Sequence, residues 1–381
     1  MKNTTLISSV MFIYYFIFVT IGFFFSRQLT TLGLPLELVG SLAVIGLVCL
    51  VISLVINGFI TDNYINNKNL IISYLCITFF CFLTFNFSTN IYVLSIVYSM
   101  IWFFFMSLTS MVDGLALNGI EQSKYPLIRA AGSIGAAFSF FLNSWVLDGV
   151  GFSFILILNS ILIIIMIILI FNICGKFTTH KIKYMNGLKI ISKNRNIILI
   201  LLITFFTYGV IAADDAFQVT FGIDYAQLSS FTLGIVGFLS MLLESIIMLF
   251  YYKIEKYIPL KSLFFICVIT LFFIFITKYL YYDIKIIVII GNIMLGLFLG
   301  LFIPMAISVI NLYTDISIRN TILSLYQAFI KLGGAFLGAF TTAYIAFGED
   351  LPSIYKLHSI ILIIPFILII FLKINSKKDN S

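Results

Sequence analysis

Long apolar runs separated by short polar segments make up almost the whole chain. A membrane-spanning α-helix needs about 20 apolar residues, and we expect twelve such helices. In the first half they lie near residues 6–26, 37–58, 70–87, 91–117, 125–147 and 152–173. In the second half they lie near residues 197–219, 230–251, 261–281, 284–311, 319–346 and 353–373. The pattern predicts an all-α membrane protein.

The composition supports this interpretation. The chain is 62% hydrophobic and 10% charged, with a mean hydropathy of +1.16. Soluble domains are about 45–50% apolar and about 25% charged. So few charges could not cover so much apolar surface in water, and lipid is therefore the expected solvent for most of the chain.

The longest polar stretch, residues 174–196, divides the chain into two predicted six-helix bundles, 1–173 and 197–381. This linker is rich in lysine and arginine, and short basic segments stay in the cytoplasm. Both termini are then cytoplasmic. The cations placed outside are few: Arg27, Lys278, Lys285 and Lys356. This asymmetry explains the formal charge of +7 without a nucleic-acid partner. The richness in Ile, Asn, Lys and Phe is typical of an AT-rich bacterial genome, so we expect a bacterial cell membrane.

The cysteines and histidines do not indicate a metal site. None of the cysteines has ligand or disulfide-framework spacing, so we expect reduced packing residues. The two histidines, at 180 and 358, are placed at helix ends far apart in the sequence. We predict no metal, no cofactor and no enzymatic activity, because no nucleophile–base pair or phosphate loop stands out. The cysteines are Cys49, Cys76, Cys81, Cys174 and Cys267.

An internal repeat links the fifth and eleventh predicted helices. Residues 129–138 read Arg-Ala-Ala-Gly-Ser-Ile-Gly-Ala-Ala-Phe, and residues 331–340 read Lys-Leu-Gly-Gly-Ala-Phe-Leu-Gly-Ala-Phe. The cation, the glycine three residues later and the final Ala-Phe coincide. Such patterns also recur by chance in apolar helices. Taken as a repeat, the pair predicts two parallel six-helix halves, as in the major facilitator fold.

The segment after the second predicted helix reads Gly58-Phe-Ile-Thr-Asp62. Facilitators carry a Gly-x-x-x-Asp signature at this place. Its Asp can cap a neighbouring helix and stabilise the outward-facing state. We therefore expect Gly58 and Asp62 to form a conformational latch.

Six charged residues fall inside predicted spans, where charges are costly and usually face a water-filled cavity or one another. They are Asp113, Arg129, Asp214, Asp215, Glu244 and Lys331. Each could instead belong to a structural ion pair. Asp113 and Arg129 lie at similar depth on two antiparallel helices. They could form a salt bridge or bind the hydroxyl groups of a solute together.

Adjacent carboxylates on a helix point about 100° apart, so Asp214 and Asp215 cannot easily share a partner. One of them could pair with Lys331 across the cavity and leave the other free to bind a proton. Gln218 lies one turn from Asp214 and could bind substrate. Glu244 has no obvious cation nearby, which makes it the first choice for the proton-carrying acid.

These residues resemble the oligosaccharide–proton symporter family, the lactose permease-like branch of the major facilitators. The likeness is sharpest at Val112-Asp113 and at Tyr125-Pro-Leu-Ile-Arg129-Ala-Ala-Gly132. The resemblance implies that Asp113 and Arg129 hold sugar hydroxyls. It also implies that Lys331 pairs with Asp214 or Asp215, and that Glu244 falls within a turn of the family's helix-eight glutamate.

Two departures limit the resemblance. The family has an aromatic residue that stacks on the sugar ring where this chain has Ala136. The family also has a His and a Glu before the proline of helix ten, whereas residues 299–303 before Pro304 hold no ionisable group. Lactose is therefore not the expected substrate, and the proton path must differ or be absent.

Three functions stay open. Proton-coupled symport of a small polar solute, a sugar or a nucleoside, fits the intramembrane charges best. Efflux of drugs or metabolites by proton antiport is the alternative, although the fifth helix has Gly132 and Gly135 without the proline of efflux signatures. A sensor or assembly partner without transport is the third. As partners we expect the solute, a proton and lipid, and a monomeric state.

Overall fold

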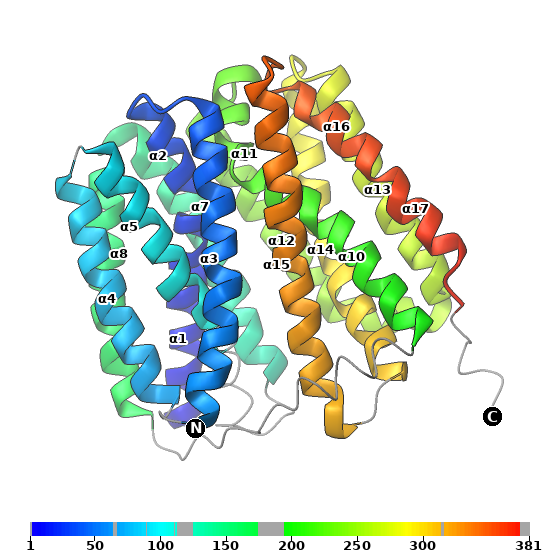
Figure 1. The fold of residues 1–381 in the computed structure, drawn as a ribbon, viewed down its shortest axis with the longest axis horizontal. Helices are drawn as coiled ribbons and strands as arrows, with labels where there is room; N and C mark the ends of the chain where they lie inside the picture. The colour runs from blue at the N-terminus through cyan, green and yellow to red at the C-terminus, as the bar shows by residue number, and fades with distance from the viewer. Residues whose placement is uncertain are drawn as a thin grey trace.

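The computed structural model describes residues 2–63, 67–88, 90–109, 111–112, 125–173, 194–313 and 316–373. This part of the chain is helical and forms an elongated bundle (Figure 1). It contains 12 helices that are long and apolar enough to cross a membrane, which confirms the predicted number of spans. Of the two ends of the bundle, we call the one at which the first helix begins, at Lys2, the terminal end, and the other the opposite end.

The elements of the first half follow the predicted spans closely. The first span continues to Thr31 through a π-helical turn, and the second continues to Asn63, beyond the predicted end at residue 58. The elements are α1 (Lys2–Val19), η1 (Thr20–Phe24), α2 (Phe25–Thr31), α3 (Leu36–Asn63), α4 (Asn67–Phe87), α5 (Ile91–Phe104), η2 (Met106–Leu108), α7 (Tyr125–Gly149) and α8 (Phe152–Asn172).

In the second half the twelfth span is broken into two helices at Leu362. Pro365 has no backbone N–H to donate to the carbonyl group of Ile361, which accounts for a break at this place. The elements are α10 (Arg195–Asp215), α11 (Gln218–Thr220), η4 (Phe221–Tyr225), α12 (Ser230–Tyr257), α13 (Leu260–Leu280), α14 (Lys285–Tyr313), α15 (Ile316–Ala346), α16 (Ser353–Ile361) and α17 (Ile363–Ile370).

Two clusters of buried apolar side chains form the core. One contains residues between Ile7 and Ile173 together with Ala335, and the other contains residues between Ile197 and Leu372 together with Ala43. The division at a linker of residues 174–196 stays a prediction, because nearly all of that segment lies outside the described residues.

Local features recur at matching places in the two halves. Each half contains one π-helical turn with a glycine in its first three residues, Gly22 in η1 and Gly222 in η4. At the terminal end, the Lys68 ammonium donates to the carbonyl oxygen of Phe171 at the end of α8. The Lys261 ammonium donates in the same way to Ile370 at the end of α17. These pairs agree with the repeat that the sequence suggested.

The two halves approach each other most closely at the opposite end. A Cβ atom added at Gly40 of α3 would overlap Thr342 of α15, and one at Gly234 of α12 would lie 2.6 Å from Cβ of Ser144 in α7. Only glycine permits such close helix contact. From these contacts α3 and α15 diverge toward the terminal end (Figure 1).

Within the second half, Gly296 of α14 contacts the backbone of α12. A Cβ atom there would overlap the backbone oxygen of Ser240, whereas one at Gly291 of the same helix would meet Ile274 at an ordinary 3.7 Å. We expect Gly296→Ala to lower the free energy of unfolding by about 1–3 kcal/mol through overpacking. Unfolding in mild detergent titrated with a denaturing detergent measures this, with Gly291→Ala as the matched control. Equal stability of both variants would contradict the close contact.

Candidate functional site

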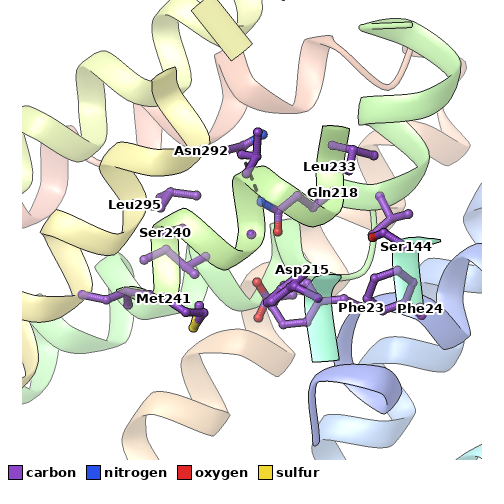
Figure 2. A pocket seen from close by; sticks show the side chains of 16 residues that line it. Phe23, Phe24, Ser144, Asp215, Gln218, Leu233, Ser240, Met241, Asn292 and Leu295 are labelled. Carbon is purple, nitrogen blue, oxygen red and sulfur yellow. Dashed lines mark hydrogen bonds between the residues drawn. The ribbon is translucent and has the colours of Figure 1, made fainter. Parts of the chain in front are cut away.

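A cavity of about 60 Å³ is lined by side chains of both halves (Figure 2). This volume holds a few water molecules and is well below the about 300 Å³ of typical ligand pockets. Its wall is mainly apolar, with a small number of polar groups. The lining residues are Phe23, Phe24, Phe140, Ser144, Ile211, Asp215, Gln218, Val219, Leu233, Val236, Gly237, Ser240, Met241, Asn292, Leu295 and Leu299.

Asp215, Gln218 and Asn292 form the polar part of this wall, with Ser144 and Ser240 beside them. The Gln218 amide nitrogen donates to the Asn292 side-chain oxygen over 3.1 Å (Figure 2). Asp215 supplies the one ionisable group in the cavity wall among the described residues. The arrangement offers both donors and acceptors to a polar solute. Asn292 was not among the predicted site residues, although an amide in an apolar helix was a visible signal.

The neighbouring Asp214 lies on a different side of α10, away from the cavity wall. Its Oδ2 atom is 3.4 Å from Nζ of Lys278 in α13, and the two side chains are 3% and 0% exposed. The Lys278 ammonium also lies 5.0 Å from the centre of the Tyr355 ring. The ion pair therefore belongs to the interior of the second half.

The placement of Lys278 among the cations on the outer side of the membrane stays a prediction. The residue lies in the last turn of α13 at the opposite end, but its side chain is fully buried. His358, expected at a helix end, lies in the last turn of α16 and is also fully buried, with Nε2 2.9 Å from Thr341 Oγ1. The sequence alone did not show that α13 and α16 pack together and enclose both side chains.

Lys331 does not form the ion pair with Asp214 that was considered for it, since Asp214 pairs with Lys278 instead. The Lys331 ammonium lies 5.9 Å from the centre of the Phe18 ring, which belongs to the first half. Lys331 and Asp215 are within electrostatic range of each other. Among the residues the structure describes, they form no ion pair within 4.0 Å.

Glu244 does have a cation nearby, contrary to expectation. It is buried in the middle of α12, at 8% exposure, and lies within electrostatic range of Arg129 in α7. The Arg129 guanidinium packs 4.2 Å from the centre of the Tyr15 ring. Spacing within one helix could not show this proximity, because Arg129 and Glu244 belong to different halves.

Several predicted site features fall outside the described residues. Asp113, the predicted partner of Arg129, is one of them, so the Asp113–Arg129 pair stays a prediction. The backbone of Gly58 and Asp62 is helical within α3, not in a loop as expected. Their side chains are not described, so the latch also stays a prediction.

An ion pair joins the two halves at the opposite end. Nη1 of Arg27 in α2 donates to Oδ2 of Asp224 in η4 over 2.5 Å. The Asp224 side chain is 43% exposed and that of Arg27 is 15% exposed. Together with the glycine contacts described above, this pair closes the bundle between the cavity and the opposite end.

Comparison with known proteins agrees with the fold. The structure of nucleoside transporter NupG matches with a TM-score of 0.79 and 13% sequence identity, over 98% of both chains. A mutant of NupG matches with a TM-score of 0.82 and 14% sequence identity, over 97% of this chain and 100% of that chain. The POT family transporter PepTSo gives 0.75 at 11% identity over 97% of both chains. The human organic anion transporter MFSD10 (TETRAN) gives 0.65 at 12% identity over 97% of this chain and 99% of that chain.

At the level of sequence, no curated protein gives a significant match. The profile of the MFS_1 like family, in contrast, matches residues 5–354. This range contains all the residues that line the cavity and both partners of the Asp214–Lys278 ion pair. The chain therefore belongs to the MFS_1 like family, within the major facilitator superfamily of membrane transporters.

Proposed function

We propose that this protein is a secondary active transporter that carries a small polar solute, a sugar or a nucleoside, together with a proton. The observation that carries the proposal is the cavity between the two halves, whose wall combines the carboxylate of Asp215 with the amides of Gln218 and Asn292. Substrate sites of such transporters lie near the middle of the membrane between the repeats.

The size of the cavity supports alternating access. About 60 Å³ is too little for a sugar or a nucleoside, and the opposite end is closed. A solute can therefore bind only after the two halves move apart. Rocking of the halves about the cavity would widen it and open it to one side of the membrane at a time.

The chemistry of the wall fits a solute that has hydroxyl groups and a flat face. Amide and carboxylate groups exchange hydrogen bonds with hydroxyls, and the rings of Phe23, Phe24 and Phe140 can pack against a sugar ring or a base. NupG, which shares the fold, is described as a nucleoside transporter. The resemblance to oligosaccharide–proton symporters supports a sugar. Arg129, Lys331 and Asp113 complete the proposed binding residues.

For the proton we propose Asp215 and Glu244 as the acids. Asp215 lies in the cavity wall, and Glu244 follows one turn after Ser240 on α12. Asp214, the third acid considered, is less suited because Lys278 already balances its charge. We further propose cytoplasmic termini, the Gly58–Asp62 latch, the two-bundle division, a bacterial cell membrane and a monomeric state.

The test is proton flux in proteoliposomes that hold the purified protein and a pH-sensitive dye. Sugars and nucleosides are added one at a time. We expect one solute class to make the outer medium more alkaline as the solute and protons enter together. Proton movement on adding lipophilic cations, with no response to any polar solute, would contradict symport and support efflux instead.

A further inference from the structure

One face of α12 carries polar side chains from the cavity to the terminal end. Ser240 lines the cavity, Glu244 follows four residues later, and Tyr251 and Glu255 follow at intervals of seven and four. These intervals place the side chains on one side of a helix. Glu244 and Glu255 are then about 16 Å apart along the helix axis.

Several hydroxyl groups in this region are buried without a hydrogen-bond partner among the described residues. They belong to Tyr208 and Thr204 of α10, Tyr251 of α12 and Tyr326 of α15. A buried polar group without a partner costs about 1–3 kcal/mol. Four such groups in one bundle indicate that something polar fills the spaces beside them.

The neighbours of these hydroxyls connect them into a series. Tyr208 is within electrostatic range of both Glu244 and Cys267. Cys267 is also within range of Tyr251, whose hydroxyl faces Ser308 of α14. Oγ of Ser308 lies 3.4 Å from a carboxylate oxygen of Glu255.

Tyr326 and Thr204 also belong to this series of hydroxyl groups. The Tyr326 hydroxyl faces Thr204 without completing a hydrogen bond of good geometry, and it is within range of Tyr208. Thr204 is fully buried and Tyr326 is 1% exposed, so bulk solvent does not reach them directly. Water molecules held by two or more polar atoms are the usual occupants of such spaces.

We propose that a file of water molecules fills these spaces and forms a proton path through the second half, from Glu244 past Tyr208 and Tyr251 to Glu255. A proton leaves the Glu244 carboxyl group, passes between water and hydroxyl oxygens, and reaches the Glu255 carboxylate, which releases it at the terminal end. Arg129 of the other half is within electrostatic range of Glu244. The path rests on the proposed proton coupling, and it is separate from the solute cavity.

The water file is tested by X-ray hydroxyl-radical footprinting of the purified protein, since radicals form from bound water and modify adjacent side chains. We expect Tyr208, Tyr251 and Tyr326 to be modified. Tyr14 is the internal control, because it is fully buried and its hydroxyl already has Met106 and Thr109 as partners. Protection of the three tyrosines to the level of Tyr14 would overturn the proposal.

Proton passage is tested separately by infrared spectroscopy of the reconstituted protein without solute. The carboxyl band lost in Glu244→Gln identifies Glu244, and its shift after transfer to heavy water gives the rate of proton exchange. We expect the double variant that carries both Tyr208→Phe and Tyr251→Phe to slow this exchange about tenfold or more, because it removes two hydroxyl groups that would relay the proton. The single variants provide the same measurement if the double variant does not fold.

The control is Tyr98→Phe, which removes the hydroxyl of a fully buried tyrosine in the first half. Unchanged exchange in the Tyr208 and Tyr251 variants, or the absence of a carboxyl band that depends on Glu244, would overturn the path. Because no solute is needed, this result is independent of the solute panel. Normal exchange at Glu244 without solute-driven proton flux would instead count against symport alone.

Discussion

Replacing Lys278 by methionine is expected to lower the free energy of unfolding by about 3–5 kcal/mol, because the change leaves the buried Asp214 carboxylate without its partner. Methionine keeps most of the length of the lysine side chain, so the loss of charge dominates the result. Lys278 is fully buried and its ammonium is 3.4 Å from Asp214. Unfolding in mild detergent titrated with a denaturing detergent measures the change.

Two further variants separate the charge from the packing. Lys285→Met removes a nearby exposed lysine and should leave the stability unchanged. Asp214→Leu combined with Lys278→Met should restore most of the lost stability, since replacing a buried ion pair by apolar residues is often neutral. A double variant as unstable as Lys278→Met alone would show that the lysine acts through something other than Asp214.

Replacing Asp215 by asparagine is expected to abolish accumulation of the solute against its gradient while leaving exchange of solute across the membrane. Asparagine keeps the shape and hydrogen-bonding capacity of the side chain but cannot bind and release a proton. Asp215 is the one ionisable side chain in the described cavity wall. Its replacement removes the carboxylate that would bind both the solute and the proton. Uptake driven by an imposed pH gradient and counterflow without one measure the two activities.

Asp283→Asn is the matched control for this variant. Asp283 is exposed between α13 and α14 and does not line the cavity, so both activities should persist. Concentrative uptake by Asp215→Asn equal to that of the unaltered protein would contradict its role and leave Glu244 as the remaining candidate acid.

The spans were predictable because hydropathy along the sequence is enough to identify each of them. A run of about 20 apolar residues has few alternatives to a membrane helix, and all twelve were confirmed. The breaks within spans were harder to foresee. The π-helical turn at Thr20–Phe24 leaves the hydrophobic run uninterrupted, so hydropathy carries no sign of it.

The site was only partly predictable, because charges in different helices find partners by packing. The angle of about 100° between successive side chains on a helix correctly implied that Asp214 and Asp215 face different surroundings. It could not tell that Lys278 would reach Asp214 from α13, or that Arg129 would come within range of Glu244 from the other half. The sequence shows which charges are costly in a membrane, and the arrangement of the helices decides which of them meet.

The Arg27–Asp224 ion pair has a consequence for how firmly the opposite end is closed. A pair this exposed contributes about 0–1 kcal/mol, and 1 kcal/mol changes a ratio of populations by about fivefold. The closed arrangement is therefore only weakly favoured by this contact, and thermal motion breaks it often. Since ions in the medium weaken exposed pairs, the salt concentration of the solution at this end shifts the balance between its closed and open arrangements.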